Sequence, residues 1–129
     1  MRLLTKSFIF ITLFSFIFSQ EDIAGFTYKG ELDGNLYYLS DDEATWTDAV
    51  SISDANGGHL VTIASEAENN FVSDMYPNWI WLGATDVDSE GNFTWITGES
   101  FSYTNWYTCC QWPDQPDNYN DVDDYIGLN

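Results

Sequence analysis

The spacing of apolar residues predicts two helices in the first half of the chain. Thr45, with Asp48 three residues later, has the pattern of a capping box and predicts the start of the first helix. Gly57 and Gly58 predict its end. The residues expected on its inner face are Trp46, Ala49, Val50 and Ser53.

A second capping box, Ser65 with Glu68, predicts the start of another helix, which Pro77 ends. The spacing of apolar residues is again helical. The residues expected on the inner face of this helix are Ala67, Phe71, Val72 and Met75.

Short apolar or alternating runs predict strands around these helices. The run WIWLGA is continuously apolar, as is typical of a strand buried on both faces, whereas NLYYLS alternates. The predicted strands are residues 35–40, 59–64, 79–84, 93–96 and 125–128, with a turn at 88–92.

Residues 97–123 show no periodicity and form a loop region of roughly 25 residues, far above the usual length of about 4–6. Loops of this size are usually functional or disordered. Tyr103, Trp106 and Trp112 lie in the region, and their large aromatic side chains favour an ordered loop.

The N-terminus has the pattern of a secretory signal. Arg2 and Lys6 precede an apolar run at 8–18, and Ser19 offers a small residue for cleavage. The run is too short for a membrane helix, which needs about 20 residues. We expect residues 1–19 to be removed and to lie outside the fold. The expected organisation is an irregular lead-in at 20–33 followed by one domain at 34–129.

The charge is strongly negative. The chain has 21 acidic and three basic residues, a net charge of −18, and loss of Arg2 and Lys6 would change this to −20 with Lys29 the remaining Lys or Arg. Such a chain repels phosphate backbones and anionic lipids, so nucleic acids and membranes are poor partners. A cation or a neutral ligand suits it better. A general acidic surface that keeps the protein soluble would account for much of the charge, but not for its clustering.

The residue types needed for catalysis are sparse. His59 is the only histidine, and we expect it to be structural. Cys109 and Cys110 are adjacent, with Cα atoms ~3.8 Å apart, so a bridge between them would be strained, and we assign them no function. Asp123 and Asp124 are poor candidates for glycosidase carboxylates, because neighbouring side chains on a strand point to opposite faces. We therefore expect a binding module and not an enzyme.

Seven motifs occur in an order that resembles the C-type lectin-like domain, over residues 34–128. The resemblance implies an α+β fold, with two helices flanking small antiparallel sheets and a long loop region that carries calcium and ligand sites. The motifs are Trp46 with Ala49, GGHLVTIASEAE (57–68), WLGATD (81–86), EGNFTWITGE (90–99), YTNW (103–106), QPDN (115–118) and DDY (123–125).

The resemblance implies a sugar-binding calcium site at Gln115, Asp117 and Asp123. Calcium takes about six to eight oxygen ligands, and this segment is rich in carboxylates and amides. In the family the bond before the proline is cis, and we predict the same for Gln115–Pro116. The order Gln-Pro-Asp goes with galactose-type sugars. Tyr119 and Trp112 are candidates to stack on the sugar, although burial in the loop is the ordinary role of an aromatic residue.

A second calcium site is implied at Asp86, Glu90, Asp123 and Asp124. Carboxylates that converge from two loops repel one another unless a cation lies between them. The alternative is an acidic surface that stays spread and solvated.

The chain also departs from the family pattern. Ser53 and Tyr125 stand where the family has cysteines, so we expect aromatic packing to replace the usual disulfides. A Trp-Asn-Asp segment and the last strands of the family would follow Asn129. As given, the chain predicts weakened calcium and sugar affinity and an exposed sheet edge. The alternatives to a secreted galactose-type lectin are a protein-binding or ice-binding module on the same fold, or an inactive fragment.

Overall fold

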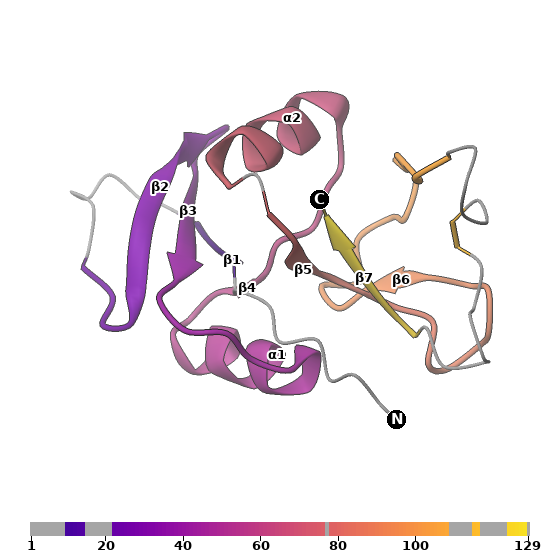
Figure 1. The fold of residues 1–129 in the computed structure, drawn as a ribbon, viewed down its shortest axis with the longest axis horizontal. Helices are drawn as coiled ribbons and strands as arrows, with labels where there is room; N and C mark the ends of the chain where they lie inside the picture. The colour runs from indigo at the N-terminus through magenta and orange to yellow at the C-terminus, as the bar shows by residue number, and fades with distance from the viewer. Residues whose placement is uncertain (1–9, 15–21, 77, 109–114, 117–123, 129) are drawn as a thin grey trace.

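The computed structural model describes residues 10–14, 22–76, 78–108, 115–116 and 124–128. Within these ranges the chain forms two helices and two antiparallel sheets (Figure 1). Helices α1 (Trp46–Ala55) and α2 (Glu66–Met75) lie on opposite sides of the strands. This is the α+β architecture that the resemblance implies. None of the helices in the described ranges has the length and apolar content needed to cross a bilayer.

The larger sheet of the described residues has four strands in the order β2-β3-β1-β4. Strand β3 (Asn35–Ser40) has the predicted bounds, but β2 (Phe26–Leu32) occupies part of the expected irregular lead-in, so that expectation is wrong. The two strands form a hairpin through Asp33 and Gly34, which have φ of 51° and 82°. A dipeptide of Asp and Gly with positive φ is the preferred two-residue hairpin turn.

Strand β1 (Phe10–Phe14) lies inside this sheet, although we expected the whole N-terminal segment to lie outside the fold. It pairs antiparallel with β3 from Phe10↔Leu39 to Phe14↔Asn35. It also pairs antiparallel with β4 (His59–Leu60). The removal of residues 1–19 stays a prediction.

Both helices begin at the predicted caps. The side chain of Thr45 accepts a hydrogen bond from the Asp48 N–H at 3.2 Å, and Ser65 Oγ accepts one from the Glu68 N–H at 3.2 Å. The inner face of α1 is as predicted, with Trp46, Ala49 and Ser53 buried and Val50 packed against them. On α2 the prediction is partly wrong, since Ala67 is exposed and Asn69 is buried in its place.

The second sheet of the described residues has the order β6-β5-β7. Strand β5 (Ile80–Thr85) lies at its centre, between β6 (Thr94–Trp95) and β7 (Tyr125–Leu128). The prediction for β7 is confirmed. Strand β5 begins one residue later than predicted, since its pairing with β7 starts at Ile80, and Trp79 beside it is 37% exposed. Strand β6 covers only the middle of the predicted run.

Residues 61–64 continue from β4 without strand pairing, although we predicted one strand over 59–64. The Val61 carbonyl accepts a hydrogen bond from the Gly83 N–H at 2.9 Å, so the chain turns from the first sheet to β5 of the second. This crossing joins the two sheets. His59 lies on β4, consistent with a structural role.

Two clusters of buried side chains form the core. One joins Tyr37 and Leu39 of β3 to Val72 of α2 and to the inner side chains of β5. The other joins Tyr38 of β3 to α1, Leu60 and Trp81. Because neighbouring residues of β3 enter different clusters, the larger sheet is covered on both faces.

Candidate functional site

Asp86 follows β5 directly and is 3% exposed. Its Oδ2 accepts a hydrogen bond from the Gly91 N–H at 2.8 Å, and its carbonyl accepts one from the Ser89 N–H at 2.9 Å. These bonds close the predicted turn. The other carboxylate oxygen, Oδ1, is buried and has no hydrogen-bond partner among the residues that the structure describes. A buried oxygen of a charged group without a partner is costly, and such an atom marks a place where a cation would fit.

Asp124 lies next to Asp86 because β7 pairs with β5. Thr85 is opposite Tyr125 in the register, and the Asp124 carbonyl accepts a hydrogen bond from the Asp86 N–H at 3.3 Å. Glu90 lies in the same turn as Asp86 and is exposed. The fold therefore gathers three of the residues predicted for the second calcium site at one end of the smaller sheet.

The described carboxylates do not by themselves complete a cation site. No group of three or more Asp, Glu, His or Cys side chains in the described ranges is arranged to hold a metal ion. Asp123, the remaining residue predicted for this site, lies outside the described residues. Asp86 and Asp124 offer oxygen donors of the type that calcium prefers.

The Gln-Pro-Asp segment is described only at its first two residues. The bond between Gln115 and Pro116 is cis, as predicted. Gln115 is exposed, and its N–H donates to the Tyr107 carbonyl at 3.0 Å, which ties the segment to an earlier part of the same loop region. The other residues predicted for the sugar site, Asp117, Tyr119, Asp123 and Trp112, lie outside the described residues.

Aromatic packing links α1 to β7, at the position where we expected it to replace a disulfide. The ring of Tyr125 stacks on Trp46 with centroids 4.5 Å apart and an interplanar angle of 22°. Trp46 Nε1 donates to the Leu82 carbonyl at 2.8 Å, which ties the same side chain to β5. Ser53 is buried and its hydroxyl donates to the Ala49 carbonyl at 2.7 Å. Since Tyr125 follows Asp124, this packing also helps to hold one end of the candidate site.

The described part of the long loop has no helix or strand and is held by aromatic contacts instead. Trp106 lies 5.5 Å from Phe93 and 6.3 Å from Phe101, measured between ring centroids. This agrees with the prediction of an ordered loop for residues 97–108. Phe101 was not singled out from the sequence, although it stands among the aromatics of the loop.

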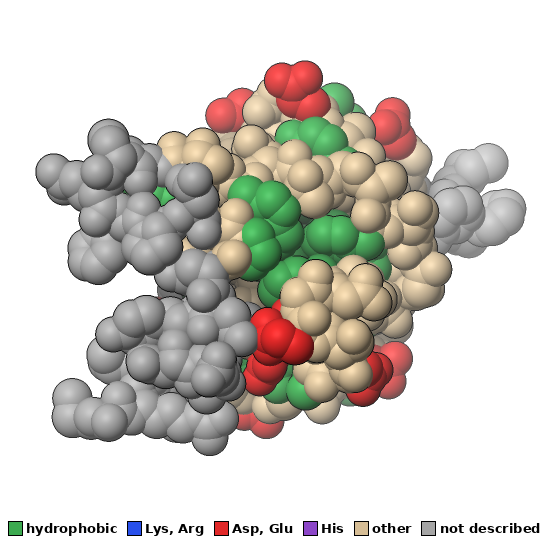
Figure 2. All heavy atoms as spheres, turned by 90° about the vertical axis from the view of Figure 1, so that its right-hand side faces the viewer, with side chains coloured by type: hydrophobic (Ala, Val, Ile, Leu, Met, Phe, Trp, Pro, Cys, Tyr) green, Lys and Arg blue, Asp and Glu red, His purple; other side chains and the backbone are tan. Residues whose placement is uncertain are grey.

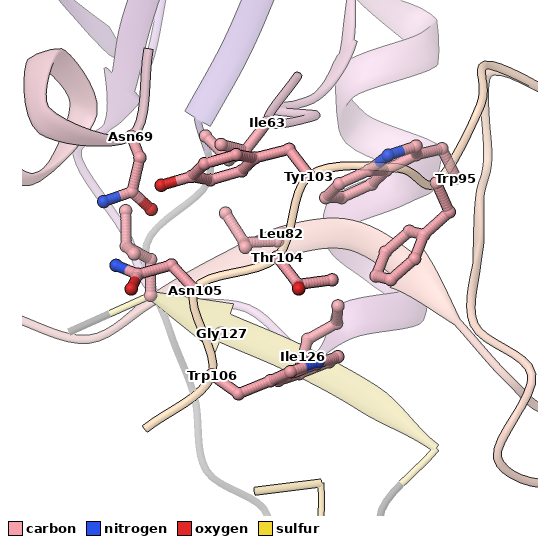
Figure 3. A pocket seen from close by; sticks show the side chains of 12 residues that line it. Ile63, Asn69, Leu82, Trp95, Tyr103, Thr104, Asn105, Trp106, Ile126 and Gly127 are labelled. Atoms are coloured by element: carbon pink, nitrogen blue, oxygen red, sulfur yellow. The ribbon is translucent and has the colours of Figure 1, made fainter. Parts of the chain in front are cut away.

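A hollow lies between this loop, β5 and β7, and Figure 2 shows apolar side chains gathered there. Figure 3 shows Tyr103, Trp106 and Ile126 around it, with the amides of Asn69 and Asn105 at one side. Its volume is about 60 Å³, far below the roughly 300–1,000 Å³ of sites that enclose small ligands. Among the described residues, none of those predicted to bind calcium or sugar lines it. The hollow is too small to enclose a sugar, and its described lining is mostly apolar packing beneath the loop.

Comparison with known proteins agrees with this architecture. The chain is 33% identical over 96 residues to lectin BRA-3 of Megabalanus rosa, an alignment that covers 72% of this chain and 56% of the relative. It is 34% identical to a perlucin-like protein of Mytilus galloprovincialis, with 69% and 58% covered. It is 33% identical to an alpha-N-acetylgalactosamine-specific lectin of Patiria pectinifera, with 70% and 58% covered. The chain thus spans a little over half the length of these relatives. The family model described as Lectin C-type domain matches residues 42–124, and the chain therefore belongs to the C-type lectin domain family.

Proposed function

We propose that this chain is a secreted module that binds galactose-type carbohydrate with the help of calcium. The calcium ligands of the sugar site are Gln115, Asp117 and Asp123. The ligands of the second calcium site are Asp86, Glu90, Asp123 and Asp124. Tyr119 and Trp112 are the aromatic side chains that face the sugar.

The observation that carries the calcium proposal is the Asp86 carboxylate. Its Oδ1 is buried without a partner among the described residues, and the adjacent backbone bond brings Asp124 to its side. Lys29, the only Lys or Arg after residue 20, lies on β2 in the other sheet. A divalent cation is the group that satisfies such carboxylates when no basic side chain does so.

Gln115 and Asp117 supply the argument for the sugar. A Gln side chain donates and accepts hydrogen bonds, whereas an ionised Asp side chain only accepts. A calcium ion held between them coordinates two adjacent sugar hydroxyls. The order of the Gln and Asp side chains then determines which of these hydroxyls accepts a hydrogen bond from the Gln amide. The Patiria relative, named for N-acetylgalactosamine, supports a galactose-type sugar, because the two sugars share the arrangement of the 3- and 4-hydroxyls. The relatives named as lectins support a binding role over a catalytic one.

The test is retention of the purified protein on immobilised galactose, with calcium and then with chelator. We expect retention that chelator abolishes. Gln115→Glu combined with Asp117→Asn should lower galactose affinity by about tenfold or more and bring retention on mannose, because each mispaired hydrogen bond in the site costs about 1 kcal/mol or more.

The matched control makes the same two chemical changes nearby, as Gln111→Glu with Asp114→Asn, and should keep galactose retention. Retention that chelator does not affect would contradict the calcium proposal. Loss of galactose binding without any gain of mannose binding would contradict the assigned roles of Gln115 and Asp117. A ligand that free sugar does not displace would indicate a protein-binding module instead.

A further inference from the structure

Asn92, Phe93 and Thr94 form a motif that the proposed carbohydrate site does not use. An Asn followed two residues later by Ser or Thr, with any residue except Pro between them, is the acceptor sequence for N-linked glycosylation in secreted proteins. Within the 129 residues of the sequence, this is the one complete copy of the motif. A motif of three residues also arises by chance, so the case depends on where the fold places Asn92.

The fold exposes the first and last residues of this motif and buries the one between them. Asn92 and Thr94 are exposed, whereas Phe93 is 9% exposed. The Phe93 ring lies 5.5 Å from the ring of Trp106 and 6.2 Å from that of Phe101, measured between centroids. This packing holds the middle of the motif in the core while Asn92 stays at the surface. A bulky sugar attached there displaces no packed side chain.

Asn92 lies at the end of the turn between β5 and β6, at a side of the molecule away from both helices (Figure 1). Its main-chain N–H donates to the Ser89 carbonyl at 2.9 Å, and the preceding Gly91 N–H donates to Asp86 Oδ2 at 2.8 Å. The Asn92 side chain makes no hydrogen bond to another described residue. The turn therefore keeps its shape without the Asn92 amide, which stays available for modification.

We propose that Asn92 is a modification site that carries an N-linked oligosaccharide. The donor is an oligosaccharide joined through N-acetylglucosamine to a polyprenyl diphosphate, which the secretory pathway supplies together with the transferase. Asn92 Nδ2 forms a bond to the anomeric carbon of N-acetylglucosamine and loses one proton, which a base of the transferase takes up. The bond between that carbon and the diphosphate oxygen breaks, and the diphosphate leaves with the electron pair.

This inference rests on the proposed secretion, because the donor and the transferase act in the lumen of the secretory pathway. It adds to the proposed function a covalent glycan next to the candidate calcium site, on the residue that follows Gly91, whose N–H binds Asp86. The residues predicted to bind calcium and sugar are left unmodified. The glycan also places a bulky hydrophilic group on the turn between β5 and β6, so a protein partner could not lie flat against that turn.

The test uses the full-length protein secreted by animal cells in culture. Intact mass is measured before and after treatment with peptide-N-glycosidase, which removes N-linked glycans and leaves Asp in place of the Asn that carried the glycan. Peptide mapping then reads residue 92 directly, so a glycan elsewhere in the chain does not affect the result. We expect Asp in place of Asn92 in most of the treated molecules. Unmodified Asn92 in the secreted protein would overturn the proposal.

Asn92→Gln and Thr94→Ala should each abolish the glycan at this position, because each removes one of the two side chains that the motif requires. Thr94→Ser is the conservative variant and should keep the glycan, since serine supplies the same hydroxyl. Asn70→Gln is the matched control for loss of an amide, because Asn70 is exposed on α2 and begins no such motif. It should keep the glycan at Asn92. A glycan at Asn92 that survives Thr94→Ala would contradict recognition through this motif.

A second version of the protein carries an unrelated secretion signal ahead of Met1, so that entry into the pathway does not depend on residues 1–19. A glycan at Asn92 in this version alone would contradict the proposed secretion signal and would support the acceptor site. Unmodified Asn92 in the secreted form of both versions would overturn the acceptor site, whether or not the protein is retained on galactose.

Discussion

Tyr37 couples the larger sheet to α2 through one side chain. It is buried, and its hydroxyl donates to Glu68 Oε1 at 2.8 Å. The other oxygen of Glu68 accepts the Ala64 N–H at 2.8 Å, so the carboxylate serves the start of α2 as well. Burial and the neighbouring Glu68 carboxylate raise the pKa of Tyr37 well above its ordinary value.

Tyr37→Phe should lower the free energy of unfolding by about 1.5–3 kcal/mol, because it removes a hydrogen bond to a charged group. The raised pKa also predicts a dependence on pH. Unfolded tyrosine loses its proton near pH 10, whereas folded Tyr37 keeps it. The stabilisation is therefore complete below about pH 10 and falls as the pH rises toward the folded pKa.

Urea unfolding from pH 8 to 11 measures both effects. Tyr107→Phe is the control, since Tyr107 is 57% exposed. The difference in stability between the wild type and Tyr37→Phe should shrink above pH 10, and the difference for Tyr107→Phe should stay small throughout. A constant difference for Tyr37→Phe would contradict the assignment.

Asp86→Asn tests whether the buried carboxylate of this single residue binds calcium. At a calcium concentration 100 times the Kd, bound calcium should stabilise the wild type by about 2.7 kcal/mol, seen as a rise in Tm. The variant should lose this rise. Without calcium it should be at least as stable as the wild type, because the change removes a buried charge whose Oδ1 has no hydrogen-bond partner among the described residues, while the side-chain oxygen of Asn can still accept the Gly91 N–H.

Asp88→Asn is the matched control for this change, since Asp88 lies in the same turn and is exposed. It should keep the rise in Tm with calcium. If both variants lost the calcium-dependent rise in Tm equally, the rise would come from the general negative charge of the turn. That result would contradict a calcium site at Asp86.

At the scale of elements, Gly83 decides how closely the two sheets approach. A Cβ at this position of β5 would lie 2.8 Å from the Leu60 carbonyl oxygen and 3.1 Å from the Ile96 side chain. The first contact is with backbone, which cannot rotate away. The crossing from β4 to β5 therefore requires glycine, although Gly83 needs no unusual φ there.

Gly83→Ala should destabilise the protein by about 1–3 kcal/mol, the usual cost of inserting a methyl group into a packed region. Gly91→Ala is the comparison. Its Cβ would meet no atom within 4 Å, but its φ of 73° is unfavourable for alanine and costs roughly 1 kcal/mol. Thermal unfolding compares the two variants, and a smaller loss for Gly83→Ala than for Gly91→Ala would contradict the close approach.

The elements that could be predicted are those with local signals. The caps at Thr45 and Ser65 placed the start of both helices correctly, because the cap bonds lie within four residues of sequence. Strand β2 was missed although Asp33 and Gly34 carry a hairpin signal. The shortening of β4 depends on the bond from Gly83 to Val61, a contact across the chain that no local pattern encodes.

At the scale of the whole molecule, the order of the family motifs predicted more of the fold than the spacing of apolar residues could. The motifs predicted that Asp86 and Asp124 lie close together although they are 38 positions apart in the sequence, and the pairing of β5 with β7 brings the backbone of the two residues together. The spacing of apolar residues alone gave no reason to expect β5 and β7 to pair. The N-terminal run shows the opposite case, since its composition predicts a signal while its position in the fold is that of a central strand. A secretory signal and a strand inside a sheet both call for an apolar run, so composition alone does not separate the two.

The stack of Tyr125 on Trp46 gives the molecule an optical reporter. Asp124 precedes the tyrosine, and the indole lies 4.5 Å from the phenol ring with the two planes nearly parallel. Indole emission responds to the local electric field and to the position of neighbouring rings. We expect a divalent cation beside Asp124 to shift the colour and intensity of Trp46 fluorescence, so that ion uptake can be followed in the unlabelled protein.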